Sequence, residues 1–256
     1  MAITPKIAAV SYLNTIPFIY GIEHEGNFCA DLLLLNPAQC AEAFAQGEVD
    51  IALVPAAVVP SLPLVEVVSE YCIGASGEVR TVVLVSDDPI DQIKRIFVDT
   101  HSRTSVQLAG YLAKNLWKIE PEWFELHDMA QLAHAEDGDA FLLIGDKVFE
   151  HEDEFDYSYD LAAEWMKSTD LPFTFAVWVA RKGTEHVVLD ALEQALEFGV
   201  EHLYEAILKY RGEDSVVEKY QYLSENIDFL FDAQKRKALK KFWDAGIKIE
   251  PKSNPG

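Results

Sequence analysis

The sequence predicts an α/β fold built as two lobes. Its 256 residues are enough for one large domain or for two lobes of ordinary size. Half of the residues are apolar, which excludes a disordered chain and indicates a real core. Over residues 1–180, short β-rich runs alternate with helical patterns. Strands interleaved with helices imply crossover connections and mainly parallel sheets flanked by helices.

The strand candidates are short β-rich runs in two sets. The first set is Lys6–Ser11, Asp31–Asn36, Asp50–Val54, Val65–Tyr71 and Arg80–Ser86. The second set is Ile96–Asp99, Trp123–His127, Ala140–Ile144 and Phe173–Ala180. Between the strands, Pro37–Gln46 begins with a proline, which suits a first helical turn, and Thr104–Asn115 carries apolar residues at helical spacing.

The chain from Gly183 onward is predicted to be helical. One apolar stripe ends near Gly212, and two further helices are expected over Ser215–Ser224 and Gln234–Ala245. The stripe consists of Leu189, Leu192, Leu196, Leu203 and Ile207.

Two pairs of similar segments indicate the division into lobes. Asp50–Pro55 is matched by Asp139–Gly145, and each follows a helix and a glycine. Ser11–Thr15 and Asp99–Ser105 each follow a strand and precede a helix. Polar turns at the carboxyl ends of strands are where open α/β sheets bind ligands, so we expect them to face each other across a cleft between the lobes.

The expected lobes are discontinuous. Residues 1–86 and 179–256 are assigned to lobe 1, and residues 87–178 to lobe 2. The long apolar runs Thr81–Val85 and Phe173–Val179 are the expected crossings between them.

Charge and composition exclude several classes of partner. The net charge of -22 argues against nucleic acid and against an anionic membrane surface. The acids are concentrated in Glu120–Glu164, whereas the tail from Ala233 is basic, and a homodimer is left open. Three cysteines make no disulfide framework, no signal peptide is recognised, and a cytoplasmic location is expected.

The turn Ser102–Ser105 is the clearest binding candidate in the residues themselves. Ser102, Thr104 and Ser105 would place hydroxyls beside the unpaired N–H groups of a helix start, where a carboxylate or phosphate binds. Arg103 would add a charge-assisted hydrogen bond, worth ~1.5–3 kcal/mol. Plain helix capping is the alternative interpretation and carries about equal weight. The same ambiguity holds for Ser11–Thr15, which also fits an ordinary turn.

Other site signals are weak. Gly74–Gly77 lacks the lysine and spacing of a phosphate loop and is interpreted as a plain turn. No dinucleotide fingerprint, nucleophile elbow or histidine pair for a metal is present, so neither a cofactor nor a metal is expected. His101 adjoins the hydroxyl turn and is either an acid–base group or a passive surface residue. The residues alone therefore indicate a binder of a small organic anion, with or without catalysis.

An ordered set of motifs resembles the chorismate dehydratases of the futalosine route to menaquinone. The opening match is Val10–Phe18 (VSYLNTIPF), which is followed by Tyr20-Gly21. The later matches are Asp50–Pro55, Ser102–Ser105, Ile144–Lys147, Asp160-Leu161, Trp165 and Leu171–Trp178 (LPFTFAVW). The resemblance implies a type II periplasmic-binding-protein-like fold that has been adopted by a cytoplasmic enzyme. It further implies conversion of chorismate to 3-[(1-carboxyvinyl)oxy]benzoate and water, without a cofactor.

The resemblance also implies roles for particular residues. Asn14 is implied to be catalytic, and a hydroxyl residue after the glycine-rich turn to be its companion. Thr81 is the best match for that hydroxyl, where the family often has serine, and Ser76 is the fallback. The implied substrate-binding residues are Ser11, Tyr12, Thr15, Ser76, Ser102, Arg103, Thr104, Ser105, Gly145 and Asp146.

The chemistry of chorismate fits a site that lacks a strong acid or base. Loss of water makes the ring aromatic, so the enzyme need only align the proton, its acceptor and the leaving hydroxyl. Our hypothesis is that the substrate's enolpyruvyl carboxylate takes the ring proton while Asn14 orients that carboxylate or the hydroxyl. The Ser102–Ser105 turn would bind a carboxylate from the opposite lobe.

Three alternatives are weighed against this function. A non-catalytic solute-binding protein of the same fold is normally exported, and no export signal is recognised here. The dihydroxynaphthoate-forming sister enzyme of the pathway has a different opening motif, although His101 keeps it open as the expected catalytic histidine. A regulator's effector domain would need a DNA-binding segment, for which there is no room before Lys6.

Overall fold

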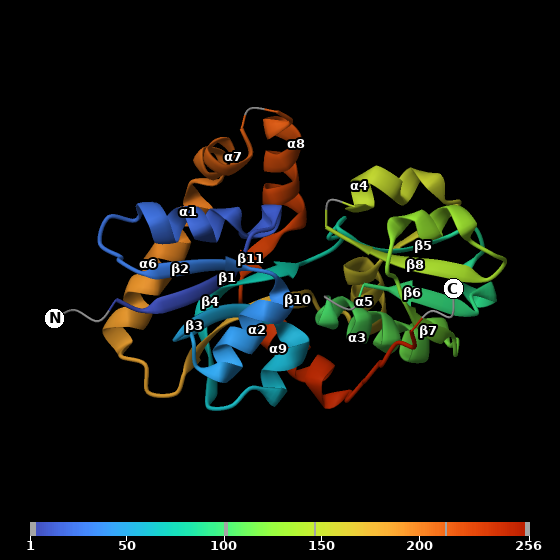
Figure 1. The fold of residues 1–256 in the computed structure, drawn as a ribbon, viewed down its shortest axis with the longest axis horizontal. Coiled ribbons are helices and arrows are strands. Elements are labelled where there is room, and N and C mark those ends of the chain that lie inside the picture. Colours follow the sequence, from blue (N-terminus) through green and yellow to red (C-terminus); the bar gives the residue numbers. More distant parts are fainter. Residues whose placement is uncertain (1–3, 100–101, 146, 213, 254–256) are drawn as a thin grey trace. The chain divides into compact units, whose positions relative to one another are not determined.

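The computed structural model describes residues 4–99, 102–145, 147–212 and 214–253. The chain divides into two compact units, each built around one sheet (Figure 1). Unit 1 comprises Met1–Ala75 and Thr174–Arg236, and unit 2 comprises Ser76–Phe173 and Lys237–Gly256. The predicted α/β fold class is therefore confirmed.

Unit 1 holds a six-stranded sheet in the order β11-β4-β10-β3-β1-β2. Its strands are β1 (Lys6–Val10), β2 (Asp31–Leu35), β3 (Ile51–Pro55), β4 (Val65–Ala75), β10 (Phe173–Arg181) and β11 (Asp228–Leu230). Its helices are α1 (Ile16–His24), α2 (Pro37–Gln46), α6 (His186–Glu201), α7 (Leu203–Arg211) and α8 (Val216–Gln221). Figure 1 shows α1, α7 and α8 above this sheet and α2 below it.

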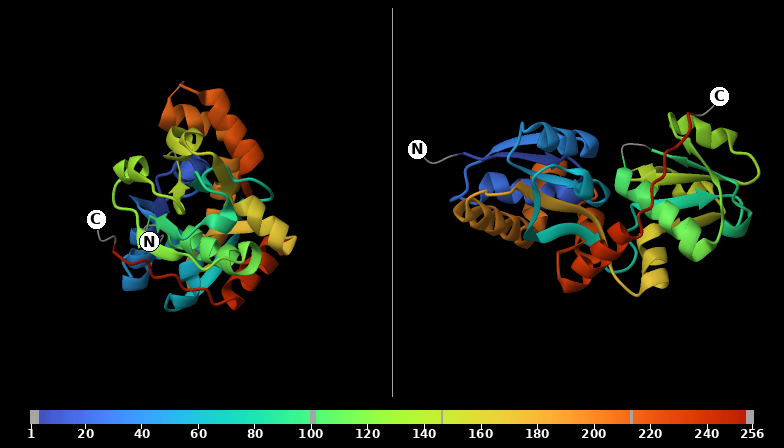
Figure 2. Two further views of the ribbon diagram at one scale, coloured as in Figure 1. Left: turned by 90° about the vertical axis from the view of Figure 1, so that its right-hand side faces the viewer. Right: turned by 90° about the horizontal axis from the view of Figure 1, so that it is seen from below.

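Unit 2 holds a five-stranded sheet in the order β7-β6-β8-β5-β9. Its strands are β5 (Val82–Ser86), β6 (Arg95–Val98), β7 (Glu122–Glu125), β8 (Asp139–Ile144) and β9 (Tyr157–Asp160). Its helices are α3 (Arg103–Leu112), α4 (Lys147–His151) and α5 (Leu161–Thr169), while α9 (Ala233–Asp244) begins in unit 1 and ends in unit 2. The chain end then runs over unit 2 (Figure 2), where Lys252 N–H donates to the Trp123 carbonyl at 2.9 Å.

The sheets are mixed, which corrects the expectation of mainly parallel sheets. Pairs β1–β2, β1–β3, β6–β7 and β6–β8 are parallel. Pairs β3–β10, β4–β11, β5–β8 and β5–β9 are antiparallel. Three of these antiparallel pairs involve β5 or β10, the strands that begin just after or contain the places where the chain passes between the units.

The unit boundaries differ from the expected lobes at three places. Strand β5 lies wholly in the sheet of unit 2, because it pairs with β8 and β9 on its two sides. The chain passes between units at Ala75/Ser76, ahead of β5, and at Phe173/Thr174, within β10. Residues 237–256 also belong to unit 2.

Aromatic packing builds the core of each unit. In unit 1, the ring of Phe18 on α1 meets Trp178 and Phe229 edge to face, with centroids 5.8 Å and 5.4 Å away. In unit 2, Trp165 on α5 meets Phe173 edge to face at 5.1 Å. Edge-to-face pairs at these distances contribute to stability beyond their buried area, so they favour a defined orientation of α1 in unit 1 and of α5 in unit 2.

Helices α1 and α6 approach each other as closely as their backbones allow. An added Cβ on Gly21 of α1 would lie 1.8 Å from the Ala195 carbonyl oxygen of α6. An added Cβ on Gly199 of α6 would lie 1.9 Å from the Pro17 carbonyl oxygen of α1. Only glycine fits at both positions, and the crossing fixes α1 directly after the Ser11–Thr15 turn.

Candidate functional site

The Ser11–Thr15 turn of unit 1 connects the end of β1 to the start of α1. Leu13–Thr15 form one turn of 3₁₀ helix, which is closed by a hydrogen bond from Thr15 N–H to the Tyr12 carbonyl at 3.0 Å. Pro17 then lies in the first turn of α1, where its missing N–H costs nothing. The turn therefore presents its polar residues at the carboxyl edge of the parallel strands β1 and β3.

The amide of Asn14 has a fixed orientation. The buried Thr15 hydroxyl donates to Asn14 Oδ1 at 3.1 Å, and Asn14 itself is half-buried. Because Oδ1 accepts this bond, the Nδ2 hydrogens are the donors that Asn14 can direct at a ligand. Ser11 and Tyr12 are exposed beside it, so the structure brings these four predicted residues together in one turn.

Arg211 also belongs to this turn, although the sequence analysis did not identify it. Its Nη2 donates to the Ser11 carbonyl oxygen at 3.0 Å from the last turn of α7. The neighbouring Tyr210 hydroxyl donates to Glu23 on α1, which ties the two helices together. Burial and this carboxylate raise the pKa of Tyr210. Arg211 thus adds a positive charge to a turn that has none of its own.

The Ser102–Ser105 turn of unit 2 opens helix α3, but it is not an ordinary cap. Ser102 makes no side-chain capping bond, and its Oγ donates instead to Ser105 Oγ at 2.8 Å. Thr104 and Ser105 are buried, and Arg103 is exposed. The capping alternative is therefore not supported for Ser102.

Thr81 and Gly145 lie together at the same edge of the sheet in unit 2. Gly145 N–H donates to the Thr81 carbonyl at 2.8 Å, just beyond the Val82–Ile144 pair of β5 and β8. Thr81 is buried, with its hydroxyl 3.5 Å from the Val79 carbonyl oxygen. Strands β6 and β8 are parallel and end at this edge, where the antiparallel β5 begins. The sheet thus brings Thr81, Gly145 and the turn after β6 to one edge.

Three other candidates have different outcomes. Ser76 is exposed in the bend after β4. Gly74 and Ala75 still belong to that strand, so the interpretation of the whole segment Gly74–Gly77 as a plain turn is wrong for its first two residues. Asp146 and His101 lie outside the described residues.

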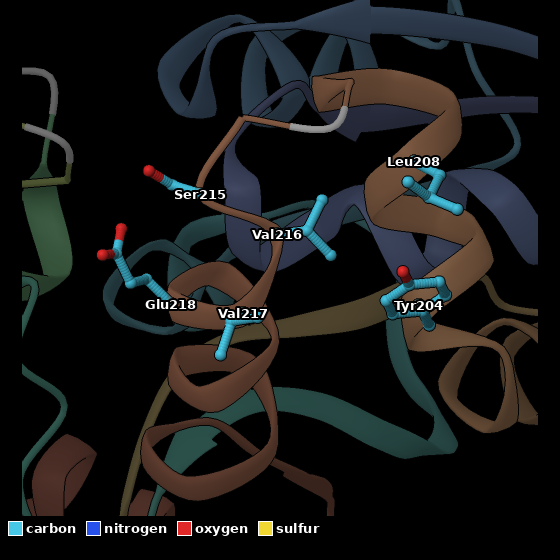
Figure 3. A pocket seen from close by; sticks show the side chains of 6 residues that line it. All are labelled: Tyr204, Leu208, Ser215, Val216, Val217 and Glu218. Atoms are coloured by element: carbon cyan, nitrogen blue, oxygen red, sulfur yellow. The ribbon is translucent and has the colours of Figure 1, made fainter.

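A cavity of about 470 Å³ lies between α7 and α8 of unit 1 (Figure 3). Its lining comes from Tyr204, Leu208, Ser215, Val216, Val217 and Glu218. None of these residues was a predicted site residue, and the lining carries no cation for an organic anion. The cavity is therefore separate from the candidate site.

Within the described ranges, no group of three or more His, Cys, Asp and Glu side chains is placed to hold a metal ion. In the same ranges, every helix is too short or too polar to cross a membrane.

Comparisons with known proteins agree with the fold and identify the family. Residues 5–247 match the family model described as menaquinone biosynthesis. A chorismate dehydratase of Thermus thermophilus is 27% identical over 203 residues, which cover 72% of each chain.

Solved structures show the periplasmic-binding-protein-like fold. A protein of Archaeoglobus fulgidus superposes with a TM-score of 0.74 at 18% identity, covering 94% of this chain and 96% of its own. A Candida albicans protein with the generic periplasmic binding protein fold gives 0.64 at 15% identity, with coverage of 96% and 92%. The alkanesulfonate-binding protein of Xanthomonas axonopodis gives 0.62 at 16% identity, with coverage of 95% and 93%. The fold predicted from the motifs is confirmed, and the chain belongs to the menaquinone biosynthesis family.

Proposed function

We propose that this protein is a chorismate dehydratase, a hydro-lyase that forms 3-[(1-carboxyvinyl)oxy]benzoate and water in the first step of the futalosine route. The observation that carries the proposal is the Asn14 amide, which Thr15 fixes with its donors available to a ligand. Family membership and the Thermus relative support the same reaction. The elimination breaks a ring C–H bond and the C–O bond of the leaving hydroxyl, and the new double bond completes the aromatic ring. No electrons enter or leave, so the reaction as proposed needs no cofactor.

Charge placement supports a substrate with two carboxylates. Arg211 lies at the Asn14 turn, and the exposed Arg103 lies in the first turn of α3. The Ser11–Thr15 turn with Arg211 and the Ser102–Ser105 turn with Arg103 are each suited to bind a carboxylate through charge-assisted hydrogen bonds. In this scheme Asn14 orients the enolpyruvyl carboxylate as it takes the ring proton, and the Thr81 hydroxyl is the companion group at the leaving hydroxyl.

The test compares chorismate turnover by wild type and two variants, with product followed by chromatography. Asn14→Ala is expected to lower kcat by about 10²–10³-fold, the usual effect of removing a donor that stabilises a transition state. Thr15→Val keeps the side-chain volume but frees the Asn14 amide, so a smaller loss of kcat is expected. Asn27→Ala, at an exposed position after α1, is the matched control and is expected to turn over like wild type.

Each outcome separates one claim from another. Wild-type protein that binds chorismate without forming product would contradict the proposed dehydratase activity and favour the alternative of a non-catalytic solute-binding protein. Full activity in Asn14→Ala would leave the reaction in place and overturn the role of Asn14.

A further inference from the structure

The carboxylate of Asp160 joins two separate segments of unit 2. Its Oδ1 accepts the Ala162 and Ala163 N–H groups, both at 3.0 Å, and so caps helix α5. Its Oδ2 accepts the Arg80 N–H at 2.7 Å, and the Val79 N–H is also directed at the carboxylate. A helix cap needs one side-chain oxygen, so the second oxygen is committed to the segment that precedes β5.

That segment holds an unusual backbone conformation. Arg80 has φ 62°, in the left-handed region that residues other than glycine rarely adopt. The hydrogen bond to Asp160 comes from the main-chain N–H, while the guanidinium lies over the Phe149 ring at 5.6 Å. Asp160 therefore binds the main chain at Arg80, the residue of this segment whose backbone has a positive φ. Strained residues of this kind persist where their surroundings hold them, often at functional sites.

Thr81 follows Arg80 directly and depends on this geometry. Its hydroxyl points back to the Val79 carbonyl at 3.5 Å, and its own carbonyl accepts the Gly145 N–H at 2.8 Å. A relaxation of Arg80 to negative φ would rotate the peptide that leads into Thr81 and move its hydroxyl. Burial of the Asp160 carboxylate raises its pKa, and the N–H donors oppose that shift by binding the charged form.

We propose that Asp160 is a positioning residue for Thr81, acting through the main chain of Arg80. The proposal rests on the proposed function, in which the Thr81 hydroxyl assists the loss of water. Asp160 touches no substrate in this scheme, and it sets where the hydroxyl lies before substrate arrives.

The test uses Asp160→Asn, which keeps the size of the side chain and a good capping oxygen for α5. The amide nitrogen of asparagine cannot accept the Arg80 N–H, so the variant weakens the hold on the Val79–Arg80 backbone while the cap of α5 remains. Asp128→Asn is the matched control, because Asp128 also caps a helical turn of unit 2, accepting the Ala130 N–H at 3.0 Å. Asp160→Asn is expected to lower kcat about tenfold with KM for chorismate nearly unchanged, and Asp128→Asn is expected to change neither.

A double-mutant cycle separates positioning from a structural role. In a Thr81→Val background, Asp160→Asn is expected to cause almost no further loss of kcat, because the hydroxyl that it positions is already absent. An equal loss of kcat in both backgrounds would overturn the proposal, and so would unchanged kcat in the single variant. Urea unfolding of each variant confirms that the native state is retained.

One readout does not depend on the reaction. In methyl-labelled protein, the Thr81 methyl resonance is expected to shift in Asp160→Asn and to stay in place in Asp128→Asn. A Thr81 resonance unchanged by Asp160→Asn would contradict the positioning role even if chorismate is converted. Failure of the wild type to convert chorismate, with the Thr81 shift present, would count against the proposed function alone.

Discussion

Alanine at Gly199 should destabilise the protein through the crossing of α1 and α6. The added Cβ would lie 1.9 Å from the Pro17 carbonyl oxygen and 3.0 Å from Gly21 N, whereas ordinary contacts begin near 3.4 Å. Backbone atoms cannot rotate away as a side chain does, so the helices would have to separate by roughly 1.5 Å. Overpacking of a core costs about 1–3 kcal/mol, and the backbone clash places Gly199→Ala at the upper end, near 3 kcal/mol.

Urea unfolding followed by circular dichroism measures this loss. The expected result is a lower midpoint with an unchanged slope, because the same surface is exposed on unfolding. Gly26→Ala is the matched control, since nothing lies within 4 Å of a Cβ added there, and its free energy of unfolding should change by less than about 1 kcal/mol. A loss of less than about 1 kcal/mol in Gly199→Ala would refute the close helix crossing.

Two further predictions concern buried ionisable groups. Asp228→Asn should cost about 3 kcal/mol of unfolding free energy, because it leaves the buried ammonium of Lys235 without its carboxylate; a loss below about 1 kcal/mol in urea unfolding would contradict this. Burial raises the pKa of Cys40 to about 12 and also raises the pKa of Cys72. At pH 8, about one Cys40 thiol in 10⁴ is therefore ionised, and the ionised form is the one that reacts. A thiol reagent at pH 8 should therefore modify the exposed Cys29 first, in a fast phase of the labelling reaction. Cys29→Ser should remove this fast phase of labelling. A fast phase that remains in Cys29→Ser would show that a buried thiol is accessible to the reagent.

The elements with strong periodicity were predictable, and the weak ones were not. Helix α2 matches its predicted range of Pro37–Gln46, because the proline and a capping box mark its start and Gly47 marks its end. Strand β9 was missed because its four residues, YSYD, lie in an acidic stretch, and β11 because it has only three residues. The single predicted stripe proved to be two helices, α6 and α7, which meet at His202, where ψ is 42°.

Local turns of the candidate site were predictable, but their long-range supports were not. The Ser11–Thr15 and Ser102–Ser105 turns are contiguous in sequence, so their polar residues stand out. The contact of Arg211 with Ser11 joins residues 200 positions apart, and the contact of Asp160 with Arg80 joins residues 80 positions apart. An arginine at a helix end and an aspartate before a helix both look like ordinary surface residues until the fold brings them to their partners.

Proton NMR of purified wild-type protein incubated with chorismate tests the central claim most directly. Chorismate carries ring protons of a cyclohexadiene, and loss of water replaces them with those of a disubstituted benzene. We predict that these aromatic signals grow as the chorismate signals decline, with the enolpyruvyl protons retained and no added metal or cofactor. Chorismate signals that broaden on binding but do not decline would contradict the account.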